Sequence, residues 1–126
     1  MPKASKETAP RAEDMGVMEG HYAEVGGYTV AFESFREDAD GTPLFRDLPD
    51  DRCQSPHWGY VVAGSLTFRY ADHDEVYEAG DAYYAPPGHV PVVTAGTDVV
   101  EFSPTGEYEK TMAVVGRNLA ALQAGG

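Results

Sequence analysis

Two histidines of this chain of 126 residues stand where predicted strands begin or turn. His57 opens a run of β-branched and aromatic residues, and His89 directly follows a Pro-Pro-Gly corner at residues 86–88. Folding can therefore bring two imidazoles together from distant positions in the sequence. Imidazole is the commonest metal ligand and also carries protons near neutral pH. These residues predict either a metal site or a proton-transfer site.

Strand and turn signals surround both histidines. Residues 57–63 and 65–70 read as two antiparallel strands joined near Gly64, because apolar and aromatic runs flank a glycine. A Gly-Asp turn at residues 80–81 then precedes a short apolar strand that ends at the Pro-Pro-Gly corner. We expect a mostly β protein with short strands.

Strand alternation decides which side chains near His57 share a face. Side chains of a strand point alternately to its two sides, so Cys53, His57, Gly59 and Val61 share one face. The other face carries Trp58, Tyr60 and Val62. Gly59 has no side chain, which leaves room beside His57 for a small ligand or for the approach of another group.

The glycine and proline spacing of residues 28–102 resembles that of the cupin family. Cupins carry the motifs G-x5-H-x-H-x3,4-E-x6-G and G-x5-P-x-G-x2-H, and Gly80, Pro86 and Gly88 match the second motif. The 15 residues between Gly64 and Gly80 equal the gap of compact cupins. The resemblance implies an all-β fold, a cupin-like double-stranded β-helix (jelly-roll) barrel, here followed by a C-terminal α-helix.

The ligand positions of the cupin motifs are not kept. The last ligand position falls on Pro91, and the glutamate position falls on His57 if Gly64 closes the first motif. The two histidine positions fall on Asp51 and Cys53. The resemblance therefore implies that His57 points into the barrel, but it does not supply the usual metal site.

An atypical site remains open to this chain. His89 lies two residues before the family's last ligand position, so the resemblance and strand parity place it on the same face as that position, toward His57. Cys53, His57 and His89 offer one thiolate and two imidazoles, which suit zinc, iron or copper and leave a coordination position free. The alternative is that both histidines are hydrogen-bonded residues lining the barrel, with Cys53 a small buried hydrophobe.

A pocket is predicted around this site from Gly59, Val61 and Glu101. Glu101 lies in the last predicted strand and can face inward with Val99, where its carboxylate can act as acid, base or fourth ligand. An exposed position for Glu101 is the alternative.

The rest of the chain divides into an arm and one barrel domain. Residues 1–20 are polar and lack periodicity, which predicts a flexible N-terminal arm, and residues 21–126 form the single barrel domain. Further predictions are a first strand at 27–35, an irregular connection at 33–52, hairpins at 72–74 and 95–97, and a helix from about residue 104. For that helix, Ser103 reads as the N-cap and Pro104 as the first residue.

Composition limits the partners and the compartment. The net charge of −12 argues against nucleic acid and against an anionic membrane surface. A single cysteine cannot form an internal disulfide, and no apolar run reaches the ~20 residues that span a bilayer. With no recognisable signal peptide, we expect a cytoplasmic protein.

Two function classes fit these residues. No nucleophile motif or phosphate-binding glycine loop is present in the sequence, so hydrolase and nucleotide-binding functions are not supported. We expect a small cupin-like protein that binds a small molecule in the barrel interior, through a divalent transition metal or without one. The alternative is a metal-dependent enzyme of the isomerase, cyclase or oxygenase type acting on a small organic substrate.

Self-association is expected as well, most simply a homodimer. Trp58, Tyr60 and Val62 form an apolar outer face if His57 points inward, and a second copy can cover it. The alternative is that the terminal helix covers this face, since its apolar stripe must pack against something. That stripe comprises Tyr108, Met112, Val115, Leu119 and Leu122.

Overall fold

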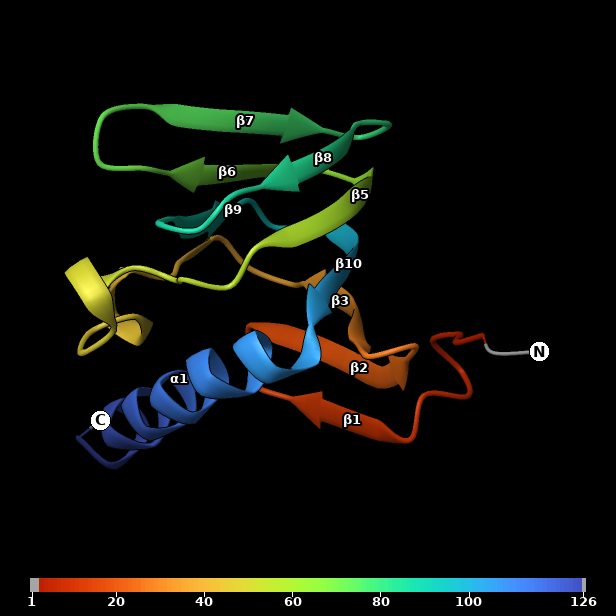
Figure 1. The fold of residues 1–126 in the computed structure, drawn as a ribbon, viewed down its shortest axis with the longest axis horizontal. Coiled ribbons are helices and arrows are strands. Elements are labelled where there is room, and N and C mark those ends of the chain that lie inside the picture. The colour runs from red at the N-terminus through yellow and green to blue at the C-terminus, as the bar shows by residue number, and fades with distance from the viewer. Residues whose placement is uncertain (1–2, 126) are drawn as a thin grey trace.

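The computed structural model describes residues 3–125 and consists of two antiparallel sheets and one long helix (Figure 1). One sheet has six strands in the order β1-β2-β3-β10-β5-β8, and the other has four in the order β4-β9-β6-β7. The strands are β1 (Arg11–Asp14), β2 (Met18–Val25), β3 (Tyr28–Phe35), β4 (Ala39–Asp40), β5 (His57–Ala63), β6 (Ser65–Arg69), β7 (Asp74–Glu78), β8 (Ala82–Ala85), β9 (Val90–Val93) and β10 (Asp98–Pro104). The helical elements are η1 (Thr42–Leu44), η2 (Pro49–Asp51) and α1 (Thr105–Gly125).

The main core lies between the two sheets. Val61 of β5 and Val99 of β10 come from the larger sheet, and they pack with Leu66, Phe68 and Val93 of the smaller sheet. The predicted parity of β5 is confirmed, because His57 and Val61 are buried while Trp58, Tyr60 and Val62 are exposed. The face of β5 that carries His57 and Val61 therefore points into the space between the two sheets.

Two predicted hairpins are wrong. β5 and β6 are joined at Gly64 but lie in different sheets, and so do β9 and β10 on either side of residues 94–97. Both connections cross between the sheets and meet each other. Gly64 has φ +82°, and a Cβ there would collide with Thr97. The Thr97 hydroxyl accepts a hydrogen bond from the Ser65 N–H at 3.0 Å and donates one to the Ser65 carbonyl at 3.1 Å, which joins the two crossings.

The other local predictions vary in outcome. β6 and β7 form the predicted hairpin with its tip at 70–73, where His73 is half-exposed beside Asp72 and Glu75. Residues 36–56 are largely irregular, as expected, and contain only β4, η1 and η2.

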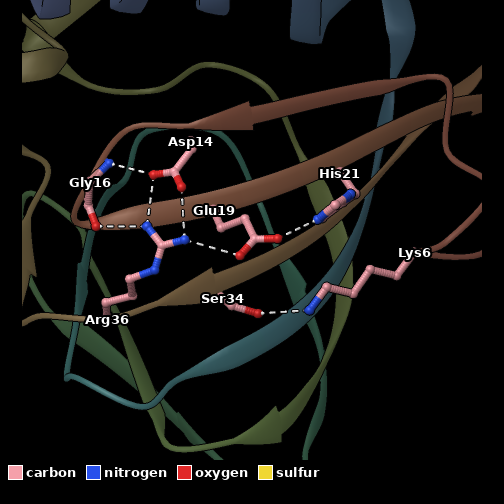
Figure 2. Close-up of polar contacts among 7 residues, drawn as sticks. All are labelled: Lys6, Asp14, Gly16, Glu19, His21, Ser34 and Arg36. Carbon is pink, nitrogen blue, oxygen red and sulfur yellow. Dashed lines mark hydrogen bonds and ion pairs between the residues drawn. The ribbon is translucent and has the colours of Figure 1, made fainter.

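The second half of the predicted flexible arm, residues 1–20, contains regular structure. β1 pairs with β2 as an edge strand of the larger sheet, and β2 begins at Met18. Figure 2 shows how this edge is held: the Arg36 guanidinium donates to both oxygens of Asp14 at 2.7 and 2.9 Å and to Glu19 at 3.1 Å. A polar sequence suffices here because an edge strand has solvent on one side. Residues 1 and 2 of that range, like residue 126 of the barrel domain, lie outside the described residues.

The terminal helix begins at Thr105, close to the predicted start, and runs past β2 toward η1 (Figure 1). Tyr108 packs on Tyr22 of β2 with ring centroids 6.4 Å apart, and Val115 packs on Phe45. Asn118 Nδ2 donates to the carbonyls of Leu44 and Arg46 at 2.9 and 2.8 Å. Within residues 3–125, no helix combines the length and apolar character needed to cross a bilayer.

The position of α1 corrects one sequence prediction and disagrees with one alternative. Ser103 and Pro104 belong to β10 and not to the helix, so Ser103 is not its N-cap. Tyr108, Met112 and Val115 of the apolar stripe pack against β2, β3 and the segment around η1, whereas Leu122 is exposed. Trp58 and Tyr60 remain 42% and 46% exposed. The helix therefore does not cover the apolar outer face formed by Trp58, Tyr60 and Val62.

Candidate metal centre

Cys53, His57 and His89 come together in the interior of the barrel. His57 is the first residue of β5, and His89 directly precedes β9. Backbone hydrogen bonds join the other two, because the Cys53 N–H donates to the His89 carbonyl and the Gly88 N–H donates to the Cys53 carbonyl, both at 2.8 Å. All three side chains are buried, and one ligand atom from each lies within 4.8 Å of the others.

Hydrogen bonds fix how the two imidazoles are turned. His89 Nδ1 lies 2.9 Å from the Pro86 carbonyl, which only accepts, so Nδ1 carries the proton and Nε2 is left with a free lone pair. His57 Nδ1 contacts the Ser103 hydroxyl at 2.7 Å and lies 3.8 Å from Glu101 Oε2. His57 Nε2 consequently points toward Cys53 Sγ at 3.6 Å.

His89 Nε2 is buried and has no hydrogen-bond partner among the described residues. Leaving a buried polar atom unpaired costs about 1–3 kcal/mol, so such an atom in a folded protein calls for an explanation, of which a bound ion is one. The lone pair of His89 Nε2 is the form of imidazole that binds a metal.

The electrostatic environment keeps the three groups neutral. Burial lowers the pKa of His57 to about 4 and that of His89 to about 3, so both imidazoles are uncharged at neutral pH. Burial also raises the pKa of the Cys53 thiol to about 12. A divalent cation reverses the second effect, because a coordinating thiol loses its proton to the metal.

The geometry suits a small transition-metal ion. Bond lengths of about 2.3 Å to sulfur and about 2.0–2.1 Å to nitrogen in a tetrahedral site place the two ligand atoms about 3.6 Å apart. Cys53 Sγ and His57 Nε2 are separated by 3.6 Å. Three protein ligands leave one position free, which is typical of sites that bind a further molecule. Cys53, His57 and His89 can therefore hold a metal ion.

A cavity of about 200 Å³ adjoins these three residues. Its walls come from both sheets, from η1 and from α1, and are largely apolar, including Phe35, Leu44, Phe68, Met112 and Val115. Cys53, His57 and His89 line it, as does Glu101.

A second polar group in the cavity consists of Glu33 of β3 and Glu101 of β10. Tyr22 donates to Glu33 Oε2 at 2.9 Å, and Tyr83 donates to Glu101 Oε1 at 2.6 Å. Burial raises the pKa of each carboxyl to about 7, and for Glu33 the neighbouring Glu101 charge adds to the effect. Such values suit a group that exchanges protons near neutral pH.

Two predicted pocket residues lie elsewhere. Gly59 and Val61 are not among the described residues that line the cavity. The space beside Gly59 is filled by the ring of Tyr83, which a Cβ at residue 59 would meet, so the glycine admits a neighbouring side chain and not a ligand. Val61 is fully buried in the core between the sheets.

Sequence reasoning missed Glu33, Ser103 and the two tyrosines that orient the carboxyls. Strand parity carried a signal for the first two. Ser103 is two residues from Glu101 in β10, and Glu33 is two residues from Phe35 in β3, which also lines the cavity. Tyr22 and Tyr83 carried no comparable signal, because tyrosine is common in strands.

Comparison with known proteins identifies the fold. No protein-family model and no curated protein matches the sequence. Among solved structures, an RmlC-like cupin from Shewanella frigidimarina is similar, with a TM-score of 0.56 and 23% identity over 80% of this chain and 88% of that one. KdgF from Halomonas sp. is similar with a TM-score of 0.52 and 19% identity over 75% of this chain and 87% of its own.

A third similar structure contains a bound molecule. A variant of the Streptomyces protein PAC13 with uridine has a TM-score of 0.55 and 17% identity, covering 81% of each chain. Likeness at these identities establishes the fold alone. The predicted all-β barrel of the cupin type, followed by a helix, is confirmed.

Proposed function

Taking the cupin fold as the premise, we propose that this protein binds a small molecule in its barrel at a divalent transition metal held by Cys53, His57 and His89. The observation that carries the proposal is the buried Nε2 of His89, which has no hydrogen-bond partner within residues 3–125 and belongs to the same cavity lining as Cys53 and His57. A metal ion at this place satisfies the lone pair of His89 and leaves a coordination position toward the cavity.

Each ligand has support from its surroundings. The Pro86 carbonyl holds the proton of His89 on Nδ1, and Ser103 with Glu101 faces Nδ1 of His57. Partners on the second ring nitrogen orient metal-bound histidines and raise their basicity. The metal itself would supply Lewis acidity toward a polar atom of the bound molecule.

Zinc, iron and copper all fit the proposed site, since one thiolate and two imidazoles suit each of these metals. The protein should be purified without a metal-affinity tag, and its metal content measured after loading with zinc and desalting. We expect about one zinc ion per chain, since the three ligands form one site. His89→Ala and Cys53→Ser should each lower zinc affinity by about 10-fold or more.

His73→Ala is the matched control, because His73 is a half-exposed histidine at the β6–β7 turn. Its zinc content should equal that of the unmodified protein. Unchanged zinc binding in both site variants, with folding verified by circular dichroism, would contradict the proposed metal centre.

An enzymatic function of the isomerase, cyclase or oxygenase type is the second candidate. It is favoured by Glu33 and Glu101, which bring two carboxyls of near-neutral pKa into the same cavity. Acid–base catalysis can be tested with 4-phenyl-2-butanone in deuterated water, following loss of its α-proton signals by NMR. We expect faster exchange with the protein than with the Glu33→Gln variant. Equal rates for protein, variant and buffer would contradict proton transfer to this class of carbonyl compound.

A further inference from the structure

Within the described range 3–125, the lining residues of the cavity include three carboxyl groups and no lysine or arginine. The carboxyl groups are Glu33, Glu101 and the exposed Asp40, which lies 3.9 Å from Arg69. Glu33 and Glu101 are the two that are partly buried. The two glutamates lie on neighbouring strands, with Glu33 two residues beyond Ala31, the partner of Glu101. Such diagonal neighbours have a spacing of roughly 7–8 Å, short enough for one group to contact both carboxyls.

Both carboxyls are oriented from behind. The buried Tyr22 and Tyr83 each donate to one oxygen, at 2.9 and 2.6 Å. The other oxygen of Glu33, Oε1, receives no hydrogen bond from any residue of the described chain, and the second oxygen of Glu101 lies 3.8 Å from His57 Nδ1. Hydroxyl donors favour the ionised form of a carboxyl, so these contacts oppose the rise in pKa that burial causes. Once the carboxyls are ionised, no lysine or arginine among the lining residues of the described range neutralises their charge.

We propose that the molecule bound in this cavity is a compact amine, with its ammonium group between Glu33 and Glu101 and its apolar body against the hydrophobic walls. This inference rests on the proposed binding of a small molecule in the barrel, but it does not require the metal. An ammonium group has three donors and no acceptor, so it can contact a carboxylate on each side. A buried charge is tolerated when it is paired and hydrogen-bonded, which the amine achieves for itself and for both glutamates.

The two carboxyl groups also disfavour anionic molecules in the part of the cavity next to Glu33 and Glu101. A carboxylate or phosphate placed there would face two acidic side chains and no cation from the lining. The walls formed by Phe35, Phe68 and Met112 suit an aromatic or aliphatic body. The volume of about 200 Å³ accommodates a single ring with a short substituent, since cavities of about 150 Å³ hold benzene.

Three probes of nearly equal shape test the inference: benzylamine, benzyl alcohol and benzoate, which differ in the charge of the head group. Binding is measured by calorimetry at about pH 8, where the amine is protonated and the carboxyls are ionised. The protein is treated with a chelator so that no metal takes part. We expect benzylamine to bind about 10-fold or more tightly than benzyl alcohol, since hydrogen bonds to charged groups are the stronger ones, and benzoate to bind weakest.

Glu33→Gln keeps the shape of the side chain and removes its charge, so it should abolish most of the preference for benzylamine over benzyl alcohol. Glu24→Gln, at an exposed position of β2, is the matched control and should leave the preference unchanged. Benzoate binding as well as benzylamine, a preference unchanged in Glu33→Gln, or no binding of any probe would overturn the inference.

Zinc binding measured in parallel separates this inference from the proposed metal centre. Zinc bound through His89 without any preference for the amine refutes the amine site alone. A preference for the amine in a protein that does not bind zinc refutes the metal centre alone.

Discussion

Glu33 is a carboxyl group that folding removes from water into the barrel. Its pKa rises from 4.5 to about 7, mainly through burial and then through the charge of Glu101. The folded state therefore holds a proton that the unfolded chain has already released between these pH values. Its contribution is fully present below about pH 4.5 and is lost as pH rises through about 7.

Glu33→Gln should remove this pH dependence. The free energy of unfolding of the variant minus that of the unmodified protein should be larger at pH 8 than at pH 5, by on the order of 1–3 kcal/mol. Urea denaturation at the two pH values measures the difference. In the folded state the charges of Glu101 and Glu13 raise the pKa of Glu33, and the hydrogen bond from Tyr22 lowers it. The lowered pKa values of His57 and His89 make stability rise with pH, but they do so in both proteins alike. An identical pH profile for the two proteins would show that Glu33 is not desolvated.

At the scale of strands, Gly59 of β5 leaves space for the side chain of Tyr83 on the neighbouring strand β8. Gly59 pairs with Tyr83, whose ring lies over the glycine and whose hydroxyl holds Glu101. Gly59→Ala should force the ring aside and lower the free energy of unfolding by about 1–3 kcal/mol, as overpacking does. Chemical denaturation measures the loss.

Gly116→Ala is the contrasting substitution. Gly116 lies within α1, and a Cβ there meets nothing within 4 Å. Alanine should stabilise the protein by about 0.8–1.0 kcal/mol through its higher helix propensity.

A Gly59→Ala variant as stable as the unmodified protein would contradict the first of these two predictions, since the ring of Tyr83 would then move without a cost in stability.

The sequence predicted the strands around the site better than their pairing. Glycine turns at residue 64 and at 95–97 look alike whether the next strand returns beside its predecessor or crosses to the other sheet, because local turn chemistry does not record which sheet follows. The contact of Thr97 with Gly64 that decides the matter joins residues 33 positions apart, by the difference of their numbers. Ser103 was misassigned for a similar reason: Ser-Pro is a common helix start, and the partner of its hydroxyl, His57, is distant in sequence.

At the scale of the whole molecule, six large apolar side chains remain exposed on the six-stranded sheet. This outer aromatic face consists of Tyr28, Trp58, Tyr60, Val62, Tyr84 and Phe102. The rings of Trp58 and Tyr84 lie 5.0 Å apart by centroid, and those of Trp58 and Tyr28 lie 5.9 Å apart. The six residues carry no charge in a chain of net charge −12, so contact between two copies through them brings no like-charged side chains of this face together.

We propose a homodimer through the outer aromatic face. Sedimentation at micromolar concentration should show a dimer for the unmodified protein and a monomer for Trp58→Asp, because a buried unpaired carboxylate opposes association. Val76→Asp is the control, since Val76 is also exposed but lies on β7 of the other sheet, and this variant should remain dimeric. A monomeric unmodified protein would contradict the proposal.

Asn118 joins α1 to the backbone around η1, and both elements form walls of the cavity. A bound molecule that leaves between α1 and η1 must break these two hydrogen bonds. For that route, we expect the residence time to depend on how often the helix opens as well as on the contacts of the molecule. Asn118→Ala should accordingly shorten that residence time while Glu33, Glu101 and the three metal-ligand candidates stay in place.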